Sequence, residues 1–182
     1  MPMFVALLRG VNVGKARRVP MADLRALIGD MGYTRVASLL NSGNLAFHAQ
    51  RGTPAIHASA IAAAITGRLK VRVPVVVKSA RQLDAIIDAN PILAEDSLHP
   101  RLLVAFVQDA KLLSNLAPIG SLVIAPEQFA MGKQAAYLLC ARGILESKAA
   151  AALLGRAGGI ATSRNWATVL KLQALANEHV VD

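Results

Sequence analysis

Residues 3–48 read MFVALLRGVNVGKARRVPMADLRALIGDMGYTRVASLLNSGNLAFH and hold four of the elements that we predict for the first half of the chain. The apolar run Met3–Arg9 indicates a strand. Apolar residues recur at helical spacing from Leu24 to Met31, after Pro20. Two further β-type runs, Val36–Leu40 and Leu45–Phe47, flank a turn, which predicts a hairpin.

The next two elements complete a recognisable order. Thr53 and Pro54 open a second helix. The β-branched run Val71–Val77 contains Pro74, which favours a strand at the edge of a sheet or a β-bulge. The resulting order over residues 3–78, β-α-β-β-α-β, predicts a ferredoxin-like α/β sandwich.

The second half repeats part of this order. Its patterns predict β-α-β-β-α and a C-terminal helix in Leu102–Val107, Ala110–Ala117, Ser121–Ala125, Ala135–Ala141, Ser147–Leu154 and Asn165 to about Asn177. The strand Ala135–Ala141 pairs either with Ser121–Ala125 or with Phe129–Met131. The final strand is missing or reduced to Val180-Val181, and the hydroxyls of Thr162-Ser163 cap the last helix.

We therefore predict an α+β protein made of two ferredoxin-like repeats, the second incomplete and followed by a C-terminal helix. Residues 1–79 form the first repeat, residues 80–100 a linking helix and loop, and residues 101–182 the second repeat with the last helix. A capping box at Ser79-Ala80-Arg81-Gln82 begins the linking helix, and Pro91 ends it.

The composition excludes several classes of protein. Of the 182 residues, 54% are hydrophobic and 17% are charged, which provides a core and excludes wholesale disorder. The single cysteine excludes a disulfide framework. No apolar run approaches the roughly 18 residues of a membrane span, and Met3–Leu8 lacks the basic leader of a secretory signal. We expect a cytoplasmic protein with no membrane partner.

Positive charge is concentrated in the first half of the chain. Residues 1–91 contain 12 basic and 4 acidic residues, a net of +8, whereas residues 92–182 contain 8 and 7, a net of +1. Arg9, Lys15, Arg17 and Arg18 fall within ten positions that contain no acid. Such a cluster attracts phosphate or carboxylate groups. The alternative is a solvated face that only keeps the protein soluble.

The loop Gly10–Ala16 follows a predicted strand and precedes a helix, as phosphate-binding loops do. It is not a nucleoside-triphosphatase loop, because only three residues separate its glycines and Ala16 replaces the hydroxyl that holds magnesium. Its backbone N–H groups and flanking cations still suit an anion. The alternative is a structural loop with ordinary surface charge.

No catalytic or metal site stands out. His48, His57, His99 and His179 are scattered without the spacing of metal ligands. Cys140 lies in an apolar run, where a core role is expected. We predict no metal and no cofactor and name no catalytic residue, so the question of an enzyme stays open.

Arg164, Asn165 and Trp166 form a second unusual segment. Trp166 is the only tryptophan of the chain, and it stands at a predicted helix start, where N–H groups and the helix dipole favour anions. In one interpretation Arg164 and Asn165 hold an anion while Trp166 stacks on a planar group. In the other, Trp166 anchors the helix on the core.

Three segments of the chain taken together resemble one family. They are Phe4–Gly14 with Val19-Pro20-Met21, then Asn41–Asn44, and then Thr162–Leu172. The combination is similar to the bacterial domain of unknown function family 1697, from the first predicted strand to the last helix. The resemblance implies a two-part α+β protein with ferredoxin-like repeats and no established activity. Lys15 and Ala167 depart from the family pattern, which often has glycine and asparagine there.

We predict that the protein binds a phosphate-bearing anionic ligand, either a nucleic acid or a nucleotide or other phosphorylated small molecule, through two basic motif loops. The candidate residues are Arg9, Asn12, Lys15, Arg18, Ser42, Asn44, Arg164, Asn165 and Trp166. In this interpretation Arg9 and Arg164 converge on one anion, whereas in the alternative the motif residues bond to one another and hold the two halves of the chain together. Two other functions remain open: a small-molecule enzyme with the same loops as a substrate clamp, and a protein-interaction module. The sequence does not reveal the oligomeric state.

Overall fold

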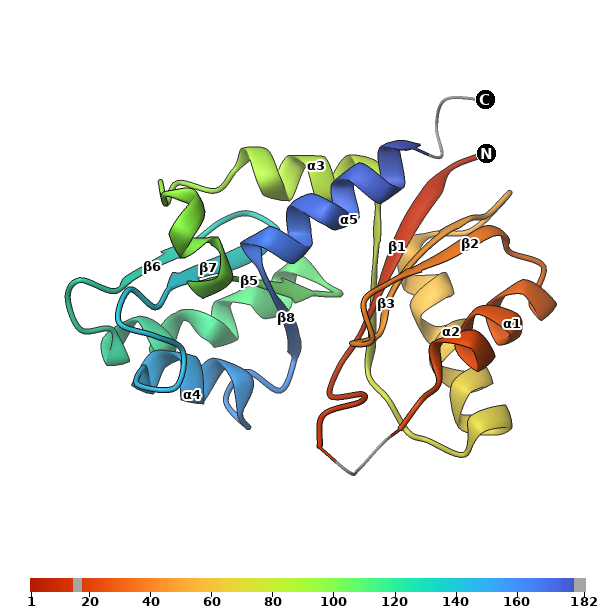
Figure 1. Cartoon of the computed structure of the whole chain (residues 1–182), viewed down its shortest axis with the longest axis horizontal. Coiled ribbons are helices and arrows are strands. Elements are labelled where there is room, and N and C mark those ends of the chain that lie inside the picture. Colours follow the sequence, from red (N-terminus) through yellow and green to blue (C-terminus); the bar gives the residue numbers. More distant parts are fainter. Residues whose placement is uncertain (15–17, 179–182) are drawn as a thin grey trace. The chain divides into compact units, whose positions relative to one another are not determined.

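The computed structural model describes residues 1–14 and 18–178, and it is an α+β protein with two four-stranded antiparallel sheets (Figure 1). The chain divides into two compact units. Unit 1 comprises Met1–Leu83 and the residues from Lys171 onward, and unit 2 comprises Asp84–Leu170. None of the helices in the described part has both the length and the apolar character needed to span a bilayer.

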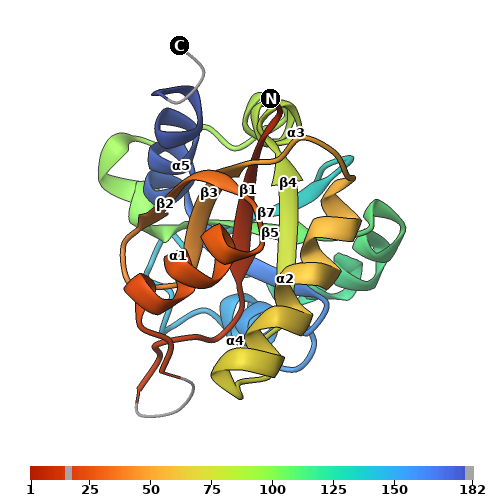
Figure 2. The ribbon, with the colours of Figure 1, turned by 90° about the vertical axis from the view of Figure 1, so that its right-hand side faces the viewer.

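Unit 1 has the order of elements predicted from the sequence. They are β1 (Met3–Leu8), α1 (Met21–Asp30), β2 (Thr34–Leu39), β3 (Asn44–His48), α2 (Pro54–Leu69) and β4 (Val75–Ser79). The strands lie in the order β2-β3-β1-β4. Both helices cover the same face of this sheet (Figure 2), where Leu24, Ile28, Ile61 and Ile65 are fully buried against the strands.

The strand pairing places three connections at one end of this sheet. β1 pairs antiparallel with β4, so that Leu8 lies opposite Val75, and with β3, so that Leu7 lies opposite Asn44. The residues that follow β1, the residues that precede β4 and the β2–β3 turn therefore lie at the same end. β4 begins at Val75 and not at the predicted Val71, because Pro74 has no N–H to donate to a ladder.

Unit 2 is built around the second sheet, whose order is β6-β7-β5-β8. Its elements are η1 (Asp96–Arg101), β5 (Leu102–Val107), η2 (Ala110–Leu122), β6 (Gln128–Met131), β7 (Ala135–Leu139), α4 (Lys148–Leu154) and β8 (Ala161–Asn165). Two helices cross the unit boundaries, α3 (Ala80–Asp88) and α5 (Trp166–Glu178). Of the two predicted partners of β7, the one that contains Phe129 is correct, because β7 pairs with β6.

Two expectations for unit 2 are wrong. The second sheet is not incomplete, because Ala161–Asn165, expected partly as a helix cap, forms β8 and pairs with β5. Val180-Val181, the alternative for that strand, lies outside the described residues. Ser121–Ala125 is not a strand: η2 extends to Leu122, and the backbone N–H of Ile124 bonds to the carboxylate of Glu127 at 3.2 Å.

Candidate functional site

The side chain of Asn12 closes the base of the loop that follows β1. Its amide nitrogen donates to the carbonyl of Val19 at 2.9 Å, and its amide oxygen accepts from the backbone N–H of Val19 at 2.8 Å. The same nitrogen also donates to the carbonyl of Asn41, at 2.8 Å, in the β2–β3 turn. The Asn12 amide thus bonds as a peptide group does and holds the two ends of the loop together. Its role in ligand binding stays a prediction.

The β2–β3 turn supports this loop from the side. Gly43 accepts a backbone hydrogen bond from Leu8 at 2.9 Å and has a φ of +75°, which favours glycine. Asn44 is fully buried, and its amide nitrogen donates to the carbonyl of Leu39 at 3.1 Å and to the hydroxyl of Ser42 at 3.0 Å. The sequence predicts Asn44 and Ser42 as ligand residues, but these bonds lie within the turn.

Basic residues gather at this end of unit 1 from two segments. Arg9 and exposed Arg18 belong to the loop after β1, and Lys15, the remaining predicted residue of that loop, lies outside the described residues. The backbone N–H of Arg9 bonds to the carbonyl of Pro74 at 2.9 Å, which fixes the loop beside the chain that leads into β4. That chain carries exposed Lys70 and Arg72. We call residues 9–14, Arg18 and residues 68–72 together the basic end of unit 1.

Lys70 and Arg72 are absent from the residues predicted by the sequence. Residues 68–72 read Arg-Leu-Lys-Val-Arg, and the alternation of cations without an acid is the signal that could have found them. Arg68 forms an ion pair with Asp30 on α1, and the ammonium of Lys70 donates to the carbonyl of Gly67 at 2.6 Å. All three cations of this segment are nevertheless exposed.

The division of charge follows the division into units. Unit 1 contains 13 basic and 4 acidic residues, a net of +9, whereas unit 2 contains 7 of each. The entire net charge of the chain therefore belongs to unit 1. An anion approaching the protein is attracted by unit 1, since exposed charges act over about 10 Å at 0.1 M salt.

The Arg164–Trp166 segment forms the junction of β8 and α5 in unit 2. Arg164 donates to the hydroxyl of Thr162 at 2.9 Å and to the carbonyl of Ser163 at 2.8 Å. Burial lowers the pKa of Arg164 to about 10, so it stays charged at neutral pH. Asn165 accepts the backbone N–H of Thr168 at 2.9 Å and caps α5, of which half-buried Trp166 is the first residue.

The structure thus brings together Arg9, Asn12, Ser42 and Asn44 at one end of unit 1. It places Arg164, Asn165 and Trp166 at one junction of unit 2. Because Arg9 and Arg164 belong to different units, their convergence on one anion stays a prediction.

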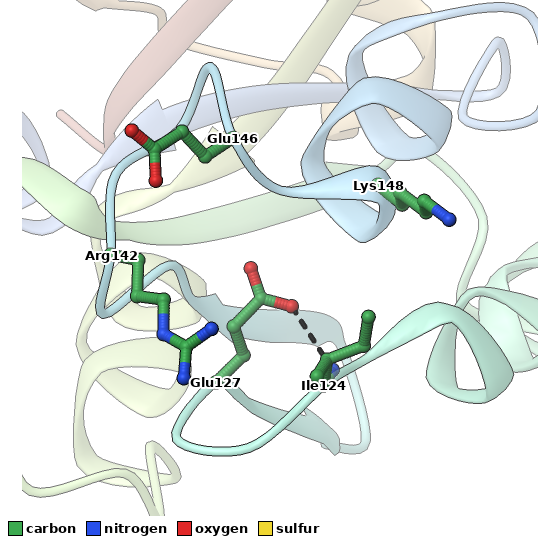
Figure 3. Close-up of a pocket in the computed structure, with 5 residues that line it drawn as sticks. All are labelled: Ile124, Glu127, Arg142, Glu146 and Lys148. Carbon is green, nitrogen blue, oxygen red and sulfur yellow. Dashed lines mark hydrogen bonds between the residues drawn. The ribbon is translucent and has the colours of Figure 1, made fainter.

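Unit 2 contains a small pocket and a buried cysteine. A pocket of about 110 Å³ in unit 2 is lined by Ile124, Glu127, Arg142, Glu146 and Lys148 (Figure 3). Two acids and two bases give it no preference for anions. Within residues 1–14 and 18–178, no three His, Cys, Asp or Glu side chains gather as a metal site. Cys140 is buried, and burial raises the pKa of its thiol, which agrees with a core role.

Comparison with known proteins identifies the family. A model of the family described as "Protein of unknown function (DUF1697)" matches residues 1–137. The chain belongs to the DUF1697 family. The part that matches the DUF1697 model contains the loop after β1 and the β2–β3 turn, whereas the Arg164–Trp166 junction follows it.

The fold of this DUF1697 protein is shared with a solved structure. The conserved bacterial protein SP0830 from Streptococcus pneumoniae matches with a TM-score of 0.75 and 22% sequence identity, over 96% of this chain and 98% of that one. At this identity the likeness concerns the fold alone. No curated protein matches the chain.

Proposed function

We propose that this protein binds a phosphate-bearing anionic ligand at the basic end of unit 1. The observation that carries the proposal is the pairing of β1 with β4, which brings two basic segments without acids to one end of a sheet. Arg18, Lys70 and Arg72 are exposed there. Lys15, Arg17 and Arg9 add to the charge of the same loop in the sequence. A cytoplasmic location, where nucleic acids and phosphorylated metabolites are abundant, belongs to the same proposal.

The scaffold of each unit supports this proposal. We infer that both units are ferredoxin-like repeats, since each sheet has its first and third strands at the centre and its second and fourth at the edges. In unit 1, the pairing of β1 with β3 and β4 brings the connection after β1, the β2–β3 turn and the residues before β4 to one end of the sheet. The Asn12 amide bonds to both backbone groups of Val19 and so holds the two ends of this connection together.

The proposal is tested by removing the exposed cations. We expect the protein to be retained on a heparin column at low salt and released near physiological salt. The variant Arg18→Gln/Lys70→Asn/Arg72→Gln should elute at markedly lower salt. Each cation that contacts the polyanion releases bound counterions, and this favourable contribution to binding is lost when the cation is removed. Asn suits position 70, where φ is +57°. A second variant, Lys15→Gln/Arg17→Gln, tests the rest of the loop.

The matched control removes three exposed cations from unit 2. Lys111→Gln/Lys133→Gln/Arg156→Gln changes the net charge equally. It should elute close to the unmodified protein. If the two triple variants elute at the same salt, the retention is a general effect of net charge, and the proposed site is wrong.

The Arg164 junction is tested in the same assay. Arg164→Lys keeps the charge but cannot donate to Thr162 and Ser163 with the same geometry. We expect it to lower the free energy of unfolding by about 1–3 kcal/mol, the usual cost of an unsatisfied buried polar group. Its elution from heparin should not change. A loss of retention in the folded variant would instead add Arg164 to the site.

A further inference from the structure

We propose that the ligand at the basic end of unit 1 is the phosphate backbone of a nucleic acid duplex, bound without contacts to unstacked bases. This inference rests on the proposed function and names the ligand class of the same site. It follows from the exposed cations in the described part of the site and from the burial of the aromatic side chains of unit 1.

The first argument concerns stacking. Proteins that bind single strands or nucleotides usually stack bases on exposed aromatic rings. In unit 1, Phe4 and Phe47 are buried in the core, at 4% and 0% exposure. Tyr33 is half-buried, and its hydroxyl lies 2.9 Å from Nδ1 of His57. The aromatic side chains in the described residues of unit 1 thus belong to the core, and its basic end offers none to a base.

The second argument concerns hydrogen bonding to base edges. Amide side chains such as asparagine read adenine and other bases through paired donors and acceptors. Three amide side chains lie at this end of the sheet, those of Asn12, Asn41 and Asn44. Asn12 uses its nitrogen and its oxygen on the backbone of Val19, and Asn44 donates to Leu39 and Ser42. Asn41 is exposed, and its amide oxygen lies 3.5 Å from the amide nitrogen of Asn12. Because two of the three amides are engaged inside the protein, we expect the basic end to contact its ligand mainly through charge.

The third argument concerns how the cations are presented. Arg18, Lys70 and Arg72 are all exposed, and they come from two segments that flank the paired ends of β1 and β4. Exposed cations on two loops suit an extended array of phosphates. A duplex offers the densest such array, about one negative charge per 1.7 Å of helix axis. A single strand offers fewer charges and relies on stacking, for which the described part of unit 1 has no exposed ring.

The test compares probes of equal length by fluorescence anisotropy. They are a 20-base-pair DNA duplex, an RNA duplex of the same sequence and a single strand of 20 thymidines, each labelled at one end. We expect both duplexes to bind at least about fivefold more tightly than the single strand at low salt. For three to five phosphate contacts, a plot of log K against log salt should have a slope of about −3 to −5.

Variants connect this binding to the site. Arg18→Gln/Lys70→Asn/Arg72→Gln should reduce the magnitude of the salt slope by about two to three, since each cation accounts for about 0.9 of it. The unit 2 variant Lys111→Gln/Lys133→Gln/Arg156→Gln should leave the slope unchanged. Circular dichroism establishes that both variants are folded. Adenosine triphosphate, compared with sodium chloride at equal ionic strength, should not displace the duplex further.

The outcomes separate this inference from the proposed function. Tighter binding to the single strand, or specific displacement by adenosine triphosphate, would overturn the duplex assignment while an anion site at the basic end remains. A slope that the unit 1 variant does not change would place duplex binding elsewhere. The absence of binding to all three probes and to heparin at low salt would contradict the proposed function itself. A difference between DNA and RNA duplexes would show which polymer the spacing of the cations fits.

Discussion

The two units use one strand register on two different sequences. In unit 1 the first residue of β1 lies opposite the last residue of β3, and in unit 2 the first residue of β5 lies opposite the last of β7. Likewise, the second residue of the central strand faces the last residue of the fourth strand in both sheets. Lys78 opposite Val5 therefore corresponds to Arg164 opposite Val104.

The units differ in the connections between these strands. Twelve residues separate β1 from α1, whereas only Gln108 and Asp109 separate β5 from η2. The long connection carries Arg9, Lys15, Arg17 and Arg18, and its unit carries the whole net charge. The strands thus form a scaffold that both units share, and the proposed site lies partly on a connection for which unit 2 has no counterpart of similar length.

Substitution of the glycines in the two hairpin turns should have the largest effect on the free energy of unfolding. A Cβ at Gly43 would lie 2.6 Å from Cγ2 of Val11 and 2.7 Å from Cβ of Leu8, at a φ of +75°. A Cβ at Gly132 would lie 2.9 Å from the carbonyl oxygen of Ala135, without positive φ. We expect Gly43→Ala to lower the free energy of unfolding by about 2–4 kcal/mol, against about 1–2 for Gly132→Ala.

Urea unfolding measures both changes, and duplex binding separates the turns further. Gly43→Ala displaces Val11, next to the Asn12 amide, so we expect it to weaken binding as well as stability. Gly132→Ala should leave binding unchanged. Equal losses of binding in the two variants would contradict the assignment of the site to unit 1. Gly67 lies in α2 with open space where a Cβ would stand, so Gly67→Ala provides a control that should not lose stability.

Local signals account for what the sequence predicts correctly. Thr53 accepts the N–H of Ile56 at 3.3 Å, and Ser79 and Gln82 form a reciprocal capping box. These bonds join residues three apart, so sequence spacing reveals them. Spacing does not reveal β8, because Ala-Thr-Ser-Arg-Asn has no apolar alternation and is a strand through its pairing with β5.

Long-range contacts account for the rest of the site. Arg72 and Arg9 lie at the same end of the sheet because β1 pairs with β4, and sequence spacing does not reveal this pairing. The same applies to Asn12, a candidate ligand by its position in a basic loop. Its bond to the carbonyl of Asn41 joins residues 29 positions apart. The sequence alone correctly predicts that the positive charge is concentrated in the first half of the chain. The hydrogen-bond partners of each polar group are known only from the structure.

A buried histidine should make unit 1 the acid-sensitive one. His57 is 3% exposed and packs against the rings of Phe4, Tyr33 and Phe47, and burial lowers its pKa below the usual 6.5. As the pH falls through about 6.5, His57 therefore binds a proton in the unfolded chain but stays neutral in the folded chain. Stability is lost as the pH falls below about 6.5, with a slope of at most about 1.4 kcal/mol per pH unit for this group.

Urea unfolding from pH 8 to pH 5 measures this slope. His57→Gln and His57→Phe should both flatten it, whatever their effect on stability at pH 8. His99→Gln, on η1 in unit 2 near Asp96, is the matched control and should retain the slope. A slope unchanged in both His57 variants would mean that other groups cause the acid sensitivity.

The smallest expected effect tests whether the two strand-to-helix junctions are equivalent. Ser79 ends β4 and accepts the N–H of Gln82 at 3.2 Å, while Asn165 ends β8 and accepts the N–H of Thr168 at 2.9 Å. Both bonds run from the last residue of the fourth strand to the residue three positions later. Because each satisfies one N–H of a helix start, Ser79→Ala and Asn165→Ala should each cost about 1 kcal/mol.

The two junctions differ in the bonds that surround the capping residue. At Ser79, the side chain of Gln82 also accepts the backbone N–H of Ser79 at 3.0 Å, and this second bond of the capping box remains in Ser79→Ala. Ser121→Ala in η2, whose hydroxyl donates to the carbonyl of Pro118 in an exposed turn, should change stability by less than about 0.5 kcal/mol. If Asn165→Ala also falls within that range but weakens duplex binding, Asn165 serves a ligand and the junctions are not equivalent. A loss of about 1 kcal/mol with unchanged binding instead makes the Arg164–Trp166 segment the counterpart of Lys78–Ala80, a structural junction that both units share.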